Sequence, residues 1–196
     1  MLPFIGAAAL AAGAIFVAEF GDKSQLLILA FATRYPWRPV VLGLVVAASI
    51  IQGISVFVGA AVGAVLPANL VAIVAGLAFL AVAAWTVLGT HEDETEAVDR
   101  PPASRVGIGL VLSVAATFVV AELGDKTMLA TFALAASQGP LPTWVGSTIG
   151  EVAANLVAVV VGRQVGTRLS PRMIRIGSAV LFAVAGALVL VGAVVG

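Results

Sequence analysis

The chain has 196 residues, of which 61% are hydrophobic and only 10% are charged, and its formal net charge is zero. Soluble proteins average about 25% charged residues, so this composition excludes an ordinary soluble domain. The chain has no cysteine, which excludes a disulfide framework and a thiolate metal site, and its balanced charge gives no indication of nucleic-acid binding. We expect a lipid bilayer to surround most of the apolar surface.

Long apolar segments separated by short polar breaks predict six membrane-spanning helices, because each segment reaches the roughly 20 residues that cross a bilayer's hydrocarbon core. In chain order they cover residues 3–33, 39–65, 69–89, 106–136, 142–167 and 173–195. The expected fold class is therefore an all-α polytopic membrane protein. No Lys or Arg precedes Lys23, which argues against a cleaved secretory signal.

The two halves of the chain match each other at an offset of 103 residues, the separation of Glu19 and Glu122, without a gap. The matching pairs include Val17-Ala18-Glu19 with Val120-Ala121-Glu122, Gly21-Asp22-Lys23 with Gly124-Asp125-Lys126, Pro39 with Pro142, and Gly43 with Gly146. We interpret this match as a duplication. It divides the chain into a first three-helix repeat (1–89), an acidic linker (90–105) and a second three-helix repeat (106–196).

The orientation of the repeats follows from their odd number of spans, which makes the second repeat enter the membrane from the opposite side. Cytoplasmic loops collect Lys and Arg. All eight arginines fall on one predicted face: Arg34, Arg38, Arg100, Arg105, Arg163, Arg168, Arg172 and Arg175. We therefore expect inverted repeats, a cytoplasmic linker and two extracytoplasmic termini.

Each half carries one charged motif inside an apolar segment. The motifs are Glu19-Phe20-Gly21-Asp22-Lys23-Ser24 and Glu122-Leu123-Gly124-Asp125-Lys126-Thr127. A charged residue at the centre of a spanning helix costs about 2.5 to 3.5 kcal/mol, so these six charges predict a function. The alternative is that lysine–carboxylate pairs only lock two helices together, which apolar packing would do at lower cost.

The helices that carry the motifs are predicted to be kinked or broken near Gly21 and Gly124. About 30 residues at about 1.5 Å each give a helix of roughly 45 Å, which exceeds a hydrocarbon core of roughly 30 Å. On an unbroken helix Ser24 and Thr127 would also point away from the acids, whereas a break lets the hydroxyls turn toward them.

Inversion would bring the two motifs together near the membrane midplane as one metal site. The expected ligands are Glu19, Asp22, Ser24, Glu122, Asp125 and Thr127, with Lys23 and Lys126 as counter-ions. Carboxylate and hydroxyl oxygens suit magnesium, calcium or manganese. Four carboxylates and two lysines leave a formal charge of −2, which one divalent cation or two protons would cancel. The set therefore predicts exchange of a cation for protons, with Glu19 and Glu122 as the expected proton carriers.

Five further polar or sulfur-containing side chains are candidates for a secondary role. Gln25 and Met128 follow the motifs at equivalent positions, and Gln52 and Asn155 form another equivalent pair. For the two amides an interhelical hydrogen bond is the simplest interpretation. Glu151 has no acidic counterpart, because Ala48 occupies the equivalent position, and it could be an outer ligand or part of a proton path.

The two motifs resemble those of the Gdt-one family of calcium/manganese:proton exchangers, and the resemblance extends over nearly the whole chain. It implies cation/proton antiport with both acids of each motif in the cation path, and it implies neither enzymatic activity nor a resident cofactor. Bacterial relatives are linked to manganese export. The resemblance and the compact chain favour a multi-pass protein of a bacterial plasma (inner) membrane that exports manganese or calcium.

Other functions are compatible with parts of the sequence. An exporter of small organic cations such as lysine would need aromatic walls, which Phe16, Phe20 and Phe118 could supply. An intramembrane hydrolase is disfavoured, since the only histidine, His91, lies outside the predicted spans and the chain carries no metalloprotease motif. The expected partners are thus a divalent cation, protons and the bilayer, and the sequence leaves a homo-oligomer open.

Overall fold

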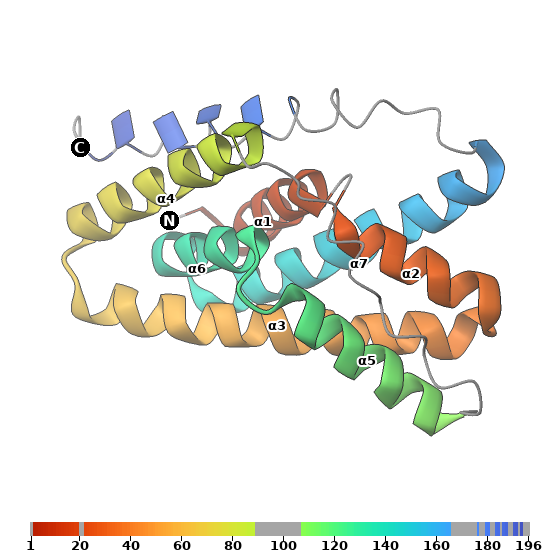
Figure 1. The fold of residues 1–196 in the computed structure, drawn as a ribbon. Coiled ribbons are helices and arrows are strands. Elements are labelled where there is room, and N and C mark those ends of the chain that lie inside the picture. The colour runs from red at the N-terminus through yellow and green to blue at the C-terminus, as the bar shows by residue number, and fades with distance from the viewer. Residues whose placement is uncertain are drawn as a thin grey trace.

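The computed structural model describes residues 2–19, 22–88 and 107–165, together with scattered positions between 176 and 193. The regular structure of these parts is helical (Figure 1). The helices are α1 (Phe4–Glu19), α2 (Lys23–Arg34), α3 (Trp37–Val65), α4 (Ala68–Leu88), α5 (Ile108–Glu122), α6 (Lys126–Gln138) and α7 (Pro140–Val165). The predicted all-α class is confirmed.

The helices follow the predicted apolar segments closely. Segment 3–33 corresponds to α1 and α2, and segment 106–136 corresponds to α5 and α6. Helices α3, α4 and α7 each begin and end within a few residues of the predicted limits. The linker 90–105 lies outside the described residues, and so does much of segment 173–195, whose described positions are helical.

Two parts of the described chain are long and apolar enough to cross a bilayer. One is α3, with 29 residues. The other is the pair α5 and α6 counted as one broken span, whose two helices are bent by 82°. Broken spans are tolerated in membranes where the freed backbone groups are buried in protein or line a cavity.

Both motif helices are broken at the motif, as the sequence predicts. In the second motif Gly124 has a φ of 84°, in the left-handed region that glycine adopts readily, and it separates α5 from α6. In the first motif α1 ends at Glu19 and α2 begins at Lys23. Residues 20 and 21 lie outside the described residues, whereas Asp22 has an extended backbone like that of Asp125.

The long helix of each half packs against the broken helices of the other half. Helix α3 contacts α5 and α6, and α7 contacts α1 and α2 (Figure 1). Glycine permits two of these contacts. A Cβ at Gly43 of α3 would lie 2.6 Å from the Val114 Cβ of α5, and a Cβ at Gly146 of α7 would lie 2.9 Å from the Ala11 Cβ of α1. The two contacts are related by the 103-residue offset, so the same helix pairing occurs twice.

The pair Gly59 and Gly63, four residues apart in α3, makes a further close contact. Added Cβ atoms there would meet the main chain of α6 at Phe132 and Ala136. The corresponding pair in the second half cannot be compared, because Gly166 lies outside the described residues.

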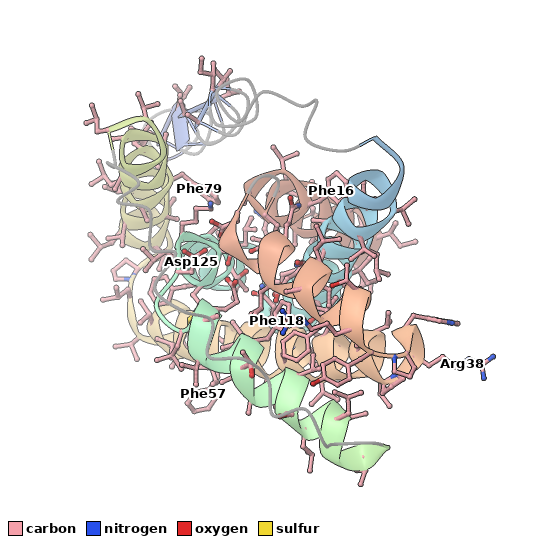
Figure 2. All side chains as sticks on the ribbon, turned by 45° about the vertical axis from the view of Figure 1, so that its right-hand side comes forward. Phe16, Arg38, Phe57, Phe79, Phe118 and Asp125 are labelled. Atoms are coloured by element: carbon pink, nitrogen blue, oxygen red, sulfur yellow. The ribbon has the colours of Figure 1, made fainter. Side chains whose placement is uncertain are left out.

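The buried side chains form two apolar clusters that hold the broken helices in place. One joins α1, α4 and α6 around Ile15 and Phe79, and the other joins α2, α3 and α5 around Phe31 and Phe118. Phe57 of α3 is 76% exposed and points outward, whereas Phe118 lies inside the helix bundle (Figure 2). Large apolar side chains on the outside of a helix bundle are typical of a lipid-facing surface.

Candidate cation-binding site

The four acidic residues of the two motifs converge on one point. One carboxylate oxygen from each of Glu19, Asp22, Glu122 and Asp125 lies within 4.8 Å of the other three. These four residues, called the acidic quartet below, come two from each half of the chain. Glu19 is 0% exposed and Glu122 is 1% exposed, so the quartet is largely shielded from solvent. Such a set of hard oxygen ligands suits a divalent cation.

The helix breaks place the quartet. Each glutamate is the last residue of a helix, α1 or α5, and each aspartate directly precedes the next helix, α2 or α6. The N–H of Asp22 donates to the Glu19 carbonyl at 3.2 Å, and the N–H of Asp125 donates to the Glu122 carbonyl at 3.1 Å. A backbone hydrogen bond therefore holds the two acids of each motif together.

The hydroxyl group of the first motif lies where the predicted break would put it. The Ser24 Oγ donates to the Glu19 Oε2 at 2.8 Å, although the two residues would point apart on a continuous helix. The equivalent Thr127 is 1% exposed at the start of α6. The Ser24 hydroxyl orients one oxygen of Glu19 and leaves the other available.

One of the two predicted lysine counter-ions pairs with an acid of the other half. The Lys126 Nζ lies 3.2 Å from the Asp22 Oδ1, and both side chains are mostly buried. This ion pair joins the start of α6 to the break between α1 and α2. The side chain of Lys23 lies outside the described part of the structure.

Two oxygens of the quartet are buried without a hydrogen-bond donor in the described part of the chain. They are the Glu19 Oε1 and the Asp22 Oδ2. A buried carboxylate oxygen without a partner is strongly unfavourable. The site therefore offers oxygen ligands that are shielded from solvent. A bound cation or a proton would supply the positive charge that these oxygens lack.

Gln25 and Met128 follow the motifs and take on local roles. The Gln25 Nε2 donates to the Ala154 carbonyl at 3.4 Å, which connects α2 to α7. The Met128 Sδ accepts a hydrogen bond from the Gly124 N–H at 3.0 Å, so the thioether caps the break in the second motif. This contact accounts for a methionine here without a role as a soft metal ligand.

Glu151, Gln52 and Asn155 form a second buried polar cluster, called the Glu151 cluster below. The Gln52 Nε2 donates to the Glu151 Oε2, which is the predicted interhelical bond between α3 and α7. The predicted interhelical bond of Asn155 is wrong, because its Nδ2 donates within α7 to the Glu151 carbonyl at 3.0 Å. An amide one turn later reaches that carbonyl easily.

Sequence reasoning missed Thr131 of α6, which is completely buried. Its hydroxyl has no hydrogen-bond partner within the described residues. Thr131 follows Thr127 by four residues and shares its helix face. The four-residue spacing from Thr127 is the sequence signal that could have identified Thr131 as a second buried hydroxyl on this face of α6.

Comparison with known proteins gives a family match in both halves. The model of the family described as "Divalent cation/proton antiporter GDT1" matches residues 7–94 and 110–196. Each matched segment contains one motif and two members of the acidic quartet.

Individual relatives agree with this match. The "Putative manganese exporter" of Vibrio cholerae is 29% identical over 171 residues, covering 86% of this chain and 82% of the relative. GDT1-like protein sll0615 of Synechocystis is 29% identical over 189 residues, covering 86% and 88%. The chloroplastic protein PAM71 of Arabidopsis thaliana is 32% identical over 196 residues, covering 87% of this chain and 52% of the relative. No solved structure matches the chain significantly.

Proposed function

We propose that the chain, which belongs to the divalent cation/proton antiporter family GDT1, exports manganese from the cytoplasm in exchange for protons. The observation that carries the proposal is the convergence of four carboxylates from both halves on one buried point. Manganese is favoured because a relative bears the name of a manganese exporter. Calcium is the second candidate ion, since the same oxygen ligands suit it.

Exchange follows from competition for the same oxygens. Metal ligands must be deprotonated, so a cation that enters the quartet displaces protons, and protons that return displace the cation. The donor-free oxygens of Glu19 and Asp22 require either a bound cation or a proton, because a vacant and fully ionised quartet is unfavourable in a buried site. The cation is the cargo of this cycle.

Lys126 is proposed to stabilise the vacant site. Its ammonium group is held 3.2 Å from the Asp22 Oδ1 and partly replaces the missing cation. An entering divalent ion repels the ammonium group and takes over the Asp22 oxygen. A tethered charge of this kind lets the site empty without leaving all four carboxylates uncompensated.

The proposed architecture is six spans in two inverted repeats in a bacterial plasma membrane, with both termini outside the cytoplasm. The gapless 103-residue match and the paired contacts of Gly43 and Gly146 support the duplication. The placement of the arginines supports the orientation. A reporter fused after Gly196 should be active only outside the cytoplasm, and cytoplasmic activity would overturn the orientation.

Transport by purified protein in liposomes tests the proposed function. Manganese or calcium uptake should drive protons the other way, and Glu19→Gln or Glu122→Gln should abolish both fluxes. A Glu96→Gln variant makes the same chemical change in the linker and should transport normally. Cation uptake without proton movement would contradict exchange. Efflux of labelled lysine in place of metal transport would favour the organic-cation alternative.

A further inference from the structure

Glu151 is a buried acid that the cation-binding mechanism leaves unused. It is 2% exposed in α7 and does not belong to the acidic quartet. Its hydrogen-bond partner is Gln52 of α3, and its own carbonyl accepts from Asn155. Burying a carboxylate beside neutral amides costs free energy, and ionisable residues inside membrane segments are usually functional.

The hydrogen bonds of the Glu151 cluster are short of donors. Within the described part of the chain, the Gln52 Oε1 and the Asn155 Oδ1 are buried and accept no hydrogen bond. An ionised Glu151 can only accept, whereas a protonated Glu151 donates one hydrogen bond. A proton on Glu151 would therefore supply a donor that a neighbouring amide oxygen lacks, and the Gln52 N–H group stabilises the ionised form. The cluster can accommodate both charge states.

The Glu151 cluster also breaks the symmetry between the two halves. Gln52 and Asn155 are equivalent under the 103-residue offset, but the equivalent of Glu151 is Ala48. Each half thus contributes one amide, and only the second half contributes an acid. One half alone therefore contributes this acid, whereas both halves contribute two acids each to the quartet.

Glu151 is close enough to the quartet for their charges to interact. Among the described residues, Glu19 at the end of α1 and Asp125 directly before α6 are the charged groups that interact with Glu151, and both helices pack against α7. Helix α3 contributes the neutral Gln52, and Lys126 of α6 is paired with Asp22. With the quartet vacant, the nearby negative charges oppose ionisation of Glu151, and a bound divalent cation reverses that effect.

We propose that Glu151 is a proton-binding residue separate from the cation-binding quartet, and that it releases its proton when the cation binds. The proposal rests on the proposed cation/proton exchange and deepens it. The step breaks the carboxyl O–H bond, passes the proton to water and leaves a carboxylate that accepts from Gln52. Cation and proton are then coupled through their charges, in addition to their competition for shared ligands.

Calorimetry of the purified chain with manganese in buffers of different ionisation enthalpy tests this proposal, because it gives both the affinity and the number of protons released per ion. Glu151→Gln keeps the size and hydrogen-bonding capacity of the side chain. We expect it to release about one proton fewer per ion and to bind manganese more weakly than the wild type by a factor that grows as the pH rises, because a side chain that cannot ionise cannot add its negative charge to the site. An unchanged proton count, or an affinity ratio to the wild type that stays constant with pH, would overturn the proposal.

A second variant keeps the test independent of how well Glu151→Gln folds. Gln52→Leu removes the donor to Glu151 and should move the pH profile of proton release to higher pH, since the ionised carboxylate loses its partner. Ser55→Ala is the matched control one turn along α3, where the hydroxyl donates to the Ile51 carbonyl of its own helix. Identical profiles for all three proteins would also contradict the proposal. A wild type that bound manganese without releasing protons would instead overturn the exchange itself.

Discussion

Glu19 has one oxygen oriented by a hydroxyl and one oxygen without a donor in the described part of the chain. The first arrangement fixes the position of the carboxylate, and the second makes it available to a cation. A ligand that is held in place before the ion arrives loses little freedom on binding. Ser24 therefore acts on cation affinity through Glu19, even if it makes no direct contact with the ion.

Removing this hydroxyl should weaken cation binding without unfolding the protein. We expect Ser24→Ala to lower manganese affinity by about tenfold, the lower end of the range for groups that support metal ligands. Ser49→Ala is the control, because the Ser49 hydroxyl donates to the Val45 carbonyl of its own helix. Calorimetric titration of both variants measures the difference. Equal affinities for the two would show that Glu19 needs no such support.

At the residue scale the sequence predicted the acids and the Ser24 hydroxyl, because each is polar within an apolar segment and recurs at the same offset. It did not predict that Lys126 pairs with Asp22 of the other half. That contact depends on the relative placement of two distant breaks. Asn155 donates to the carbonyl one turn back in its own helix, and a sequence does not reveal whether an acceptor on another helix lies within reach.

The helix breaks are the structural elements that turn two linear motifs into one site. Each break places a glutamate at a helix C-terminus and an aspartate at the next N-terminus. The existence of the breaks was predictable from helix length and glycine position. Their geometry was not, because the 82° bend between α5 and α6 depends on how both helices pack against α3.

Gly124 offers a direct test of the break. A Cβ added there would meet nothing within 4 Å, so any effect of Gly124→Ala must come from its positive φ. We expect a loss of about 1–2 kcal/mol in the free energy of unfolding and weaker manganese binding, with a milder effect for Gly124→Asn. Gly13→Ala is the control, since Gly13 is equally uncrowded but helical. Denaturation in detergent measures the stability of Gly124→Ala and Gly13→Ala, and equal stabilities for the two variants would contradict a strained break.

At the scale of the whole molecule, each half completes the other. Helix α3 supports the broken pair of the second half, α7 supports the broken pair of the first half, and the quartet takes two acids from each. The match between the halves was visible in the sequence, because charged motifs recur without a gap. The exchange of packing partners was not, because an internal sequence match does not say which helices touch.

The central claim is that the two motifs build a single cation site, and the number of manganese ions bound per chain tests it most directly. We expect wild type to bind one manganese ion at the site, and Glu19→Gln or Glu122→Gln alone to remove it. Equilibrium dialysis with the purified protein gives this number for all three proteins. Two ions per wild-type chain, with one retained by each variant, would show that each motif forms its own site and would contradict the account.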